Sequence, residues 1–185
     1  ETPLLTAHRP GSSLDAFVYL TGFTRGLSPA SLTWDIPGDA PNNGVIQNFD
    51  NQYHGPIRLR IAMANDYQTP VETVKAQMGL ENVTKIASSF GIELDKDVTM
   101  LKLAGAYGVF GTQGVYLGQS INDSFIPASI LRVESVDHSV WLDWTTPEAR
   151  CVVTPALAYL MTHALSDESA RWPSPARSKR CCSGT

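Results

Sequence analysis

The Pro-Gly-Ser-Ser stretch at residues 10–13 constrains the fold of this chain most, because it marks the beginning of a helix. The residues that follow place apolar side chains at intervals of three and four, which is helical spacing. We therefore predict a helix that begins near Ser12, has a serine side chain as its N-cap, and ends near Gly26. On such a helix Ser12 and Asp15 lie one turn apart on the same face.

The rest of the sequence predicts further helices and then strands. Residues 27–55 are rich in Pro, Gly, Asn and Asp, and we expect them to form a long loop beside a functional cleft. Predicted helices span residues 57–64, 70–79, 81–90 and 99–110, the last of them mostly buried, and Thr154-Pro155 opens another. Residues 130–136 and 140–144 are predicted to form a β-hairpin. This order predicts an α+β fold.

The composition excludes several classes of partner. A chain of 185 residues can bury one core, so we expect a single domain. The net charge is -4 and there is no long basic tract, so no nucleic-acid partner is expected. The sequence contains neither a transmembrane segment nor a recognisable targeting signal. Its histidines and cysteines lack zinc-site spacing, so no metal and no cofactor are expected.

Six segments carry motifs that occur together in one protein family. They read RPGSS at 9–13, QNFD at 47–50 with YHGPIRLR at 53–60, ANDYQTPV at 64–71, GLENV at 79–83, LAGAY at 103–107 with GVY at 114–116, and TPALAYLMT at 154–162 with ARWP at 170–173. In order and spacing, these segments resemble the transpeptidase domain of class A (bifunctional) penicillin-binding proteins. The resemblance covers nearly the whole chain.

This resemblance implies a particular part of a known fold. It implies the helical half of a penicillin-binding-protein and serine β-lactamase-like transpeptidase domain, with a β-hairpin and with most of the central sheet missing. We therefore expect residues 1–185 to be a partial, truncated domain. Apolar side chains that would face the missing sheet are expected to be exposed and to favour self-association.

The first motif of the family pairs a nucleophilic serine with an activating lysine three residues later. Ser12 matches the serine, whereas Asp15 stands where the family has the lysine. Ser12 could therefore be a nucleophile or only a helix N-cap. We expect Asp15 to be a weak base, because an aspartate has an ordinary pKa of about 3.9 and a helix N-terminus lowers it further.

The second and third motifs are altered as well. Asp66 replaces the second serine of the family, and Gln68 replaces its asparagine. Cys182 replaces the lysine of the K-T-G motif, while Ser183 and Thr185 match residues that would contact substrate. The resemblance therefore implies Ser12, Asp15 and Asp66 as catalytic candidates and the other four positions as substrate-binding candidates.

These substitutions make the expected site acidic. The loss of two lysines and the gain of two aspartates lower its formal charge by about four units. The peptidoglycan stem peptides and β-lactams that the family binds carry a carboxylate, which such a site repels. Alternatively, Asp15 and Asp66 could share a proton, which raises one of the two pKa values, or could hold a divalent cation.

Three functions are compatible with this sequence. The first is a penicillin-binding-protein-like D,D-transpeptidase homologue of weak or no activity, with stem peptide or β-lactam as its partner and a family location outside the cytoplasmic membrane. The second is a hydrolase on the same scaffold, acting as an esterase, a β-lactamase-like enzyme or a carboxylate-pair enzyme. The third is a non-catalytic binding or assembly module that uses the exposed sheet-facing surface.

Overall fold

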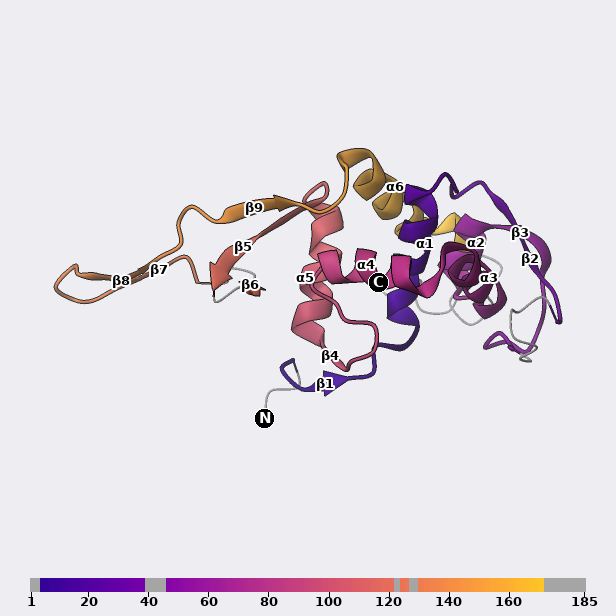
Figure 1. Cartoon of the computed structure of the whole chain (residues 1–185), viewed down its shortest axis with the longest axis horizontal. Coiled ribbons are helices and arrows are strands. Elements are labelled where there is room, and N and C mark those ends of the chain that lie inside the picture. Colours follow the sequence, from indigo (N-terminus) through magenta and orange to yellow (C-terminus); the bar gives the residue numbers. More distant parts are fainter. Residues whose placement is uncertain (1–3, 39–45, 122–123, 127–129, 172–185) are drawn as a thin grey trace, which may run out of the picture.

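The computed structural model describes residues 4–38, 46–121, 124–126 and 130–171 of the chain. This part contains α-helices gathered into one body and short antiparallel strands, many of which extend to one side of that body (Figure 1). The predicted α+β class is confirmed.

Helix α1 (Asp15–Thr24) is the central helix and continues a 3-10 turn, η1 (Gly11–Leu14). Residues 16–23 are all buried, so α1 presents no solvent-facing stripe. The predicted helix is confirmed, but its predicted serine cap is wrong, since no side chain caps the start of either η1 or α1. The chain enters through the 3-10 turn instead, where the hydroxyl of Ser13 donates to the carbonyl of Pro10.

Other helices surround α1 and agree with the predicted segments. They are α2 (Leu59–Asn65), α3 (Gln68–Met78), α4 (Leu80–Ser89), α5 (Met100–Gly111) and α6 (Pro155–Leu165). Aromatic side chains connect three of these helices. Phe17 of α1 packs edge-on against Phe90, which follows α4, and against Tyr107 of α5, with ring centroids 5.2 and 5.8 Å apart. This aromatic contact anchors the N-terminal half of α1 in the core.

The ends of α5 and α6 follow the sequence signals closely. Thr99 accepts a hydrogen bond from the backbone nitrogen of Lys102, and Thr154 caps α6 in the same way. The expectation that α5 is mostly buried is wrong for its first turn, because Met100 and Leu101 are exposed. This helix turns only one side toward the core, so its apolar composition overstates its burial.

The strands form small antiparallel sheets. The pairs are β1 (Ala7–His8) with β4 (Val98–Thr99), β2 (Leu32–Asp35) with β3 (Gly55–Arg58), β5 (Val115–Ile121) with both β6 (Ser124–Ile126) and β9 (Glu148–Cys151), and β7 (Arg132–Glu134) with β8 (Val140–Asp143). The predicted hairpin is confirmed as β7–β8. The prediction of an unbroken loop over residues 27–55 is wrong, because β2 lies within it and pairs with β3 at its far end.

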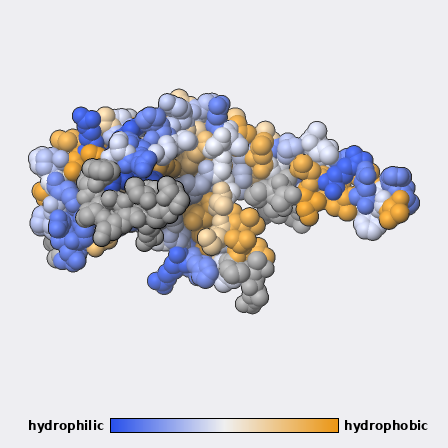
Figure 2. Space-filling view, turned by 180° about the vertical axis from the view of Figure 1, so that it is seen from behind, coloured by the Kyte–Doolittle hydropathy of each residue, from blue (hydrophilic) through white to orange (hydrophobic). Residues whose placement is uncertain are grey.

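Strands β5, β7, β8 and β9 form an arm that extends away from the helices (Figure 1). Val136 is fully exposed and Trp141 is 74% exposed, although both are apolar. Apolar surface is visible along this arm from behind (Figure 2). The arm is therefore the part of the described chain where apolar side chains lie most openly in solvent.

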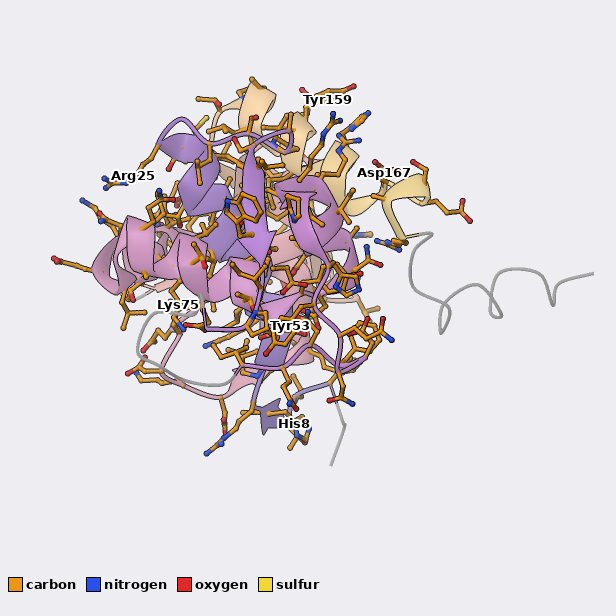
Figure 3. The ribbon with its side chains drawn as sticks, turned by 90° about the vertical axis from the view of Figure 1, so that its right-hand side faces the viewer. His8, Arg25, Tyr53, Lys75, Tyr159 and Asp167 are labelled. Carbon is orange, nitrogen blue, oxygen red and sulfur yellow. The ribbon has the colours of Figure 1, made fainter. Side chains whose placement is uncertain are left out.

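An ion pair links α2 to the segment that follows α6. Arg60 donates to Asp167 at 2.6 Å, and Asp167 lies at the periphery of the helical body (Figure 3). Hydrogen bonds from Ser169, from the backbone nitrogen of Ala170 and from Arg60 lower the pKa of Asp167 to about 2. Asn65, the last residue of α2, donates to the carbonyl of Ala170 at 2.8 Å, and this bond holds the 3-10 turn η2 (Ser169–Arg171) against the end of α2.

Gly114, between α5 and β5, occupies a position that no side chain fits. Its φ is +90°, and a Cβ there would lie 2.2 Å from the carbonyl oxygen of Val153.

We predict that Gly114→Ala lowers the free energy of unfolding by about 1–3 kcal/mol through backbone strain, and that the clash with Val153 adds to this loss. Gly108→Ala is the matched control, because it lies within α5 with open space around its Cβ, and it should raise stability by about 0.5–1 kcal/mol. Urea unfolding followed by circular dichroism measures both, and unchanged stability in Gly114→Ala would contradict this account.

Candidate active site

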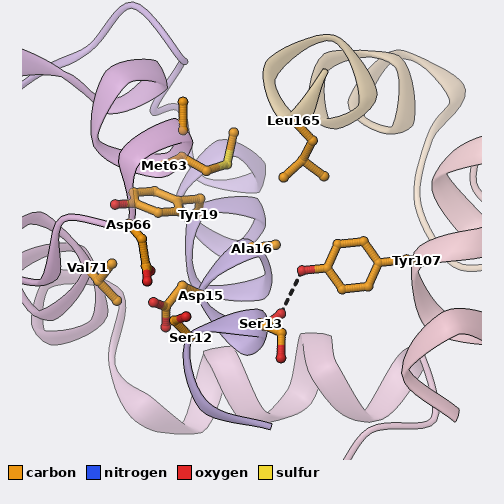
Figure 4. Close-up of a pocket in the computed structure, with 11 residues that line it drawn as sticks. Ser12, Ser13, Asp15, Ala16, Tyr19, Met63, Asp66, Val71, Tyr107 and Leu165 are labelled. Atoms are coloured by element: carbon orange, nitrogen blue, oxygen red, sulfur yellow. Dashed lines mark hydrogen bonds between the residues drawn. The ribbon is translucent and has the colours of Figure 1, made fainter. Parts of the chain in front are cut away.

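A cavity of about 210 Å³ lies where the start of α1 faces the end of α2 (Figure 4). Its walls come from η1, α1, α3, α5, α6 and the end of α2. The polar residues that line it are Ser12, Ser13, Asp15, Tyr19, Asp66 and Tyr107. Ser12, Asp15 and Asp66 thus surround one cavity although Asp66 is far from the other two in the sequence.

Ser12 is held at the cavity by its backbone. It lies within η1, and the next residue, Ser13, accepts a hydrogen bond through its carbonyl from the hydroxyl of Tyr107 at 2.6 Å. This bond ties the turn to α5, as the dashed line in Figure 4 marks. The serine therefore has a fixed place at the rim of the cavity without acting as a helix cap.

Asp66 reaches the cavity because α2 ends there in a left-handed residue. Its φ and ψ are 59° and 44°, a conformation that Asp tolerates better than most residues do. Gln68, at the start of α3, donates its amide to the carboxylate of Asp66 at 3.2 Å and, more weakly, to that of Asp15 at 3.5 Å. A single amide thus lies between the two acids.

The pKa of Asp15 is raised to about 7, mainly by burial and then by the negative charge of Asp66, while the Gln68 amide acts in the opposite direction. The expectation that the pKa of Asp15 is lowered is therefore wrong, although a carboxylate with a pKa of about 7 is still a weaker base than a neutral lysine. The position of Asp15 at the start of α1 favours the charged form, but burial beside a second carboxylate outweighs that effect. The alternative expectation, in which one acid of the pair has a raised pKa, agrees with the structure.

A second polar network supports the start of α3. The carboxylate of Asp35 is fully buried, and it accepts hydrogen bonds from Asn48 at 2.8 Å and from the ring nitrogen Nδ1 of His54 at 2.9 Å. The His54 ring stacks on Tyr67. Asn48 also accepts a hydrogen bond from the backbone nitrogen of Gln68 at 2.9 Å. Gln68 is therefore held beside the cavity by Asn48, which does not itself line the cavity.

Sequence reasoning missed Tyr19, which also lines the cavity. Tyr19 follows Asp15 by four residues, so helical spacing alone places the two on one face. Its side chain is 1% exposed, and its hydroxyl has no hydrogen-bond partner in the described part of the chain. Burial and the charges of Asp15, Asp66 and Asp35 raise its pKa well above the ordinary value.

The remaining site candidates cannot be placed. Cys182, Ser183 and Thr185 lie outside the described residues. Within the described ranges, no three His, Cys, Asp or Glu side chains gather in a group suited to a metal ion. The catalytic and substrate-binding roles of all seven candidates remain predictions.

Comparisons with known proteins lead to one family. Penicillin-binding protein 1A of Vibrio cholerae is 27% identical over 124 residues, which is 58% of this chain and 15% of that protein. Penicillin-binding protein 1A of Neisseria cinerea is 23% identical over 177 residues, covering 86% of this chain and 22% of that protein. The chain is homologous to class A penicillin-binding proteins. It spans less than a quarter of the length of these two relatives, and no family model matches it.

Solved structures of penicillin-binding proteins share the fold. Penicillin-binding protein 1A from Haemophilus influenzae has a TM-score of 0.75 at 19% identity, and the match covers 94% of this chain and 31% of that one. The PonA1 protein from Mycobacterium tuberculosis, in complex with penicillin V, has a TM-score of 0.73 at 16% identity, covering 88% and 47%. The penicillin-binding-protein transpeptidase fold, implied by the sequence motifs, is therefore confirmed. None of the helices in the described ranges has the length and apolar character needed to span a membrane.

The raised pKa of Asp15 predicts a specific dependence of stability on pH. Because the folded-state pKa of about 7 lies above the unfolded value of about 3.9, the folded state binds this proton more tightly, and stability falls as pH rises between those values. Asp15→Asn cannot lose a proton, so it should lose less stability than the wild type between about pH 4 and pH 7. Urea unfolding across this range tests the difference, with Asp95→Asn, an exposed acid, as the charge-matched control. Parallel curves for Asp15→Asn and the wild type would refute the raised pKa.

Proposed function

We propose that this chain is a penicillin-binding-protein-like D,D-transpeptidase homologue in which serine acyl transfer is weak or absent. One observation carries the proposal: a carboxylate, Asp15, lies beside Ser12 in the place of the family's lysine and is paired with Asp66. We further propose that residues 1–185 form a partial transpeptidase domain and that Ser183 and Thr185 contact substrate.

The physical argument rests on charge. Family ligands such as the peptidoglycan stem peptide and β-lactams carry a carboxylate, and the M. tuberculosis neighbour was solved with penicillin V. At pH 8 Asp15 is mostly deprotonated, because its pKa is about 7, so an anionic ligand meets its negative charge beside that of Asp66. Within the described part of the chain, no basic residue lines the cavity to offset them. The family's place of action, outside the cytoplasmic membrane, is proposed for this chain by homology alone.

A fluorescent penicillin tests this function directly. We predict that the wild-type chain forms no label that survives denaturing gel electrophoresis, because it lacks both the lysine that activates the serine in the family and the lysine that binds the ligand carboxylate. The variant Asp15→Lys, Asp66→Ser, Gln68→Asn, Cys182→Lys restores the family motifs and should label faster. Adding Ser12→Ala to this variant should abolish that label. Stable labelling of the wild-type chain that Ser12→Ala removes would overturn the proposal.

A second candidate function is ester hydrolysis on the same scaffold. It is favoured by the pKa of about 7 for Asp15, since a general base is most effective when its pKa lies near the working pH. In this mechanism the Asp15 carboxylate takes the proton of the Ser12 hydroxyl, whose oxygen attacks the ester carbonyl and expels the alcohol, which takes up that proton. Water, deprotonated in turn by Asp15, then hydrolyses the acyl-serine ester and releases the acyl group as an acid. A carboxylate-pair version would use water directly, with Asp15 and Asp66 as acid and base.

The hydrolase candidate predicts turnover of p-nitrophenyl acetate that rises through about pH 7, as Asp15 loses its proton. Asp15→Asn should reduce the rate about 100-fold or more, which is the usual contribution of a general base. Loss of turnover in Ser12→Ala indicates the serine route, and retention indicates the carboxylate-pair route. Asp95→Asn should leave the rate unchanged. A rate that is the same in Asp15→Asn as in the wild type rejects the candidate.

A non-catalytic assembly role is the third candidate. The exposed apolar side chains of the β5–β9 arm support it, because large apolar surfaces on soluble proteins often mark interaction sites. Self-association through this arm is part of the proposal. Absence of turnover together with concentration-dependent association would favour it over the hydrolase.

A further inference from the structure

A series of hydrogen bonds connects a buried carboxylate outside the cavity to the two acids inside it. Asp35, on β2, accepts from the side-chain amide of Asn48, and Asn48 accepts from the backbone nitrogen of Gln68, the first residue of α3. The side-chain amide of Gln68 then donates to Asp66 at 3.2 Å and to Asp15 at 3.5 Å. The acids of the cavity are therefore linked to residues that do not line it.

The hydrogen bonds of Asn48 allow its side chain only one orientation. The side-chain nitrogen donates both of its hydrogens, one to Asp35 at 2.8 Å and the other to the carbonyl of Gln52 at 2.7 Å. Because a flipped amide would turn its oxygen toward these two acceptors, it would lose both bonds. The side-chain oxygen of Asn48 therefore faces the backbone nitrogen of Gln68, which donates to it at 2.9 Å.

Asp35 is itself fixed from several sides. Its side chain is 0% exposed, and the carboxylate oxygen that bonds to Asn48 also accepts from the backbone nitrogen of His54 at 3.0 Å. The His54 ring lies 2.9 Å from the same oxygen, reaches Asp50 with its other nitrogen at 3.2 Å, and stacks on Tyr67. Asn48 is therefore bonded to a group that has little freedom to move.

The start of α3 depends on the contact with Asn48. The N-cap residue, Tyr67, makes no side-chain capping bond, although the first backbone nitrogens of a helix have no partner within it. Asn48 satisfies the nitrogen of Gln68 from a distant part of the sequence. Its side chain thus does for α3 what a capping residue usually does from within the helix sequence.

The place of Gln68 affects how tightly Asp15 holds its proton. Burial raises the pKa of Asp15, as do the charge of Asp66 and the hydrogen bond between the two acids. The hydrogen bond from Gln68 acts in the opposite direction and lowers this pKa. Its length of 3.5 Å is near the outer limit of a hydrogen bond, so a small displacement of the start of α3 is enough to break it.

We propose that Asn48 is a positioning residue for the acid pair, because it fixes the start of α3 so that the amide of Gln68 reaches both carboxylates. Asn48 does not line the cavity, and its effect on Asp15 passes through Gln68. The proposal goes beyond the proposed function, since it concerns the proton on Asp15 whether or not Ser12 is acylated.

Several groups besides Gln68 face Asp15. Asp66 lies at the end of α2, Glu72 on α3, where it is paired with a lysine of the same helix at 2.9 Å, Tyr19 on α1 and Tyr107 on α5. Burial and then the charge of Asp15 raise the pKa of both tyrosines, that of Tyr107 to about 12. Both tyrosines therefore stay neutral while Asp15 titrates near pH 7.

An NMR titration of the side-chain carboxyl of Asp15 in the full chain tests the proposal. Asn48→Ala should move the midpoint of this titration upward by about 0.5–1 pH unit, the scale of one lost hydrogen bond to a charged group. Gln68→Ala, which removes the amide itself, should move the midpoint upward by a similar amount. In the double variant the two changes should not add, because Asn48 then has no amide to position.

Two comparisons separate positioning from general support of the fold. Asp35→Asn keeps an acceptor for the amide of Asn48 and should leave the Asp15 midpoint at its wild-type value, whereas Asp35→Ala releases Asn48 and should raise it. These two variants decide the question if Asn48→Ala does not fold. Val74→Ala removes a buried side chain of α3 and should lower the free energy of unfolding without moving the midpoint.

Three results would overturn the proposal: a wild-type midpoint in Asn48→Ala, an effect of Asn48→Ala that persists in full in the Gln68→Ala background, or an equal effect of Val74→Ala. Penicillin labelling tests the proposed function separately. Labelling of the wild-type chain together with the expected midpoints rejects that function alone. Absence of labelling together with an unmoved midpoint in Asn48→Ala rejects the positioning role alone.

Discussion

The burial of α1 on every side is the constraint on which the rest of the structure depends. Because residues 16–23 are all buried, the neighbouring helices must close around α1 rather than lie on one face of it. Phe17 fixes the depth of the helix through its contacts with Phe90 and Tyr107. The first turn of α1 is therefore packed against the helical body. Asp15 is partly buried there, whereas the start of an isolated helix would leave it in water.

Two opposing effects meet at Asp15. A helix N-terminus stabilises a carboxylate by about 0.3–1 kcal/mol when the site is exposed to solvent. Burial destabilises the charged form by more, and the neighbouring charge of Asp66 adds to that effect. At the start of an isolated helix in water the pKa of Asp15 would be lowered, whereas in the packed protein it is raised to about 7. The acid–base behaviour of the candidate site therefore depends on packing as much as on residue type.

Much of the fold could be predicted from the sequence, and the reasons differ between elements. The helices followed from apolar spacing, Thr99 and the Thr154-Pro155 pair, all of which are local signals. Strands β2, β5 and β9 were missed because they are stabilised by partners distant in the chain. The meeting of Ser12 with Asp66 came from family resemblance, since spacing alone cannot join positions 12 and 66. The raised pKa of Asp15 could not be predicted with certainty, because it depends on burial that only the packed structure defines.

The cavity is held together largely through main-chain atoms. Tyr107 holds η1 by a carbonyl oxygen, and Asn48 holds the start of α3 by a backbone nitrogen. Every residue type offers a carbonyl, and every type except proline offers that nitrogen, so these bonds survive most exchanges of the side chains facing the cavity. A lineage carrying this scaffold can therefore change or lose its reaction by single substitutions without first losing its fold. The side chains that determine the reaction can change while the backbone contacts that maintain the fold are kept, so a pocket of this kind can come to bind a different ligand.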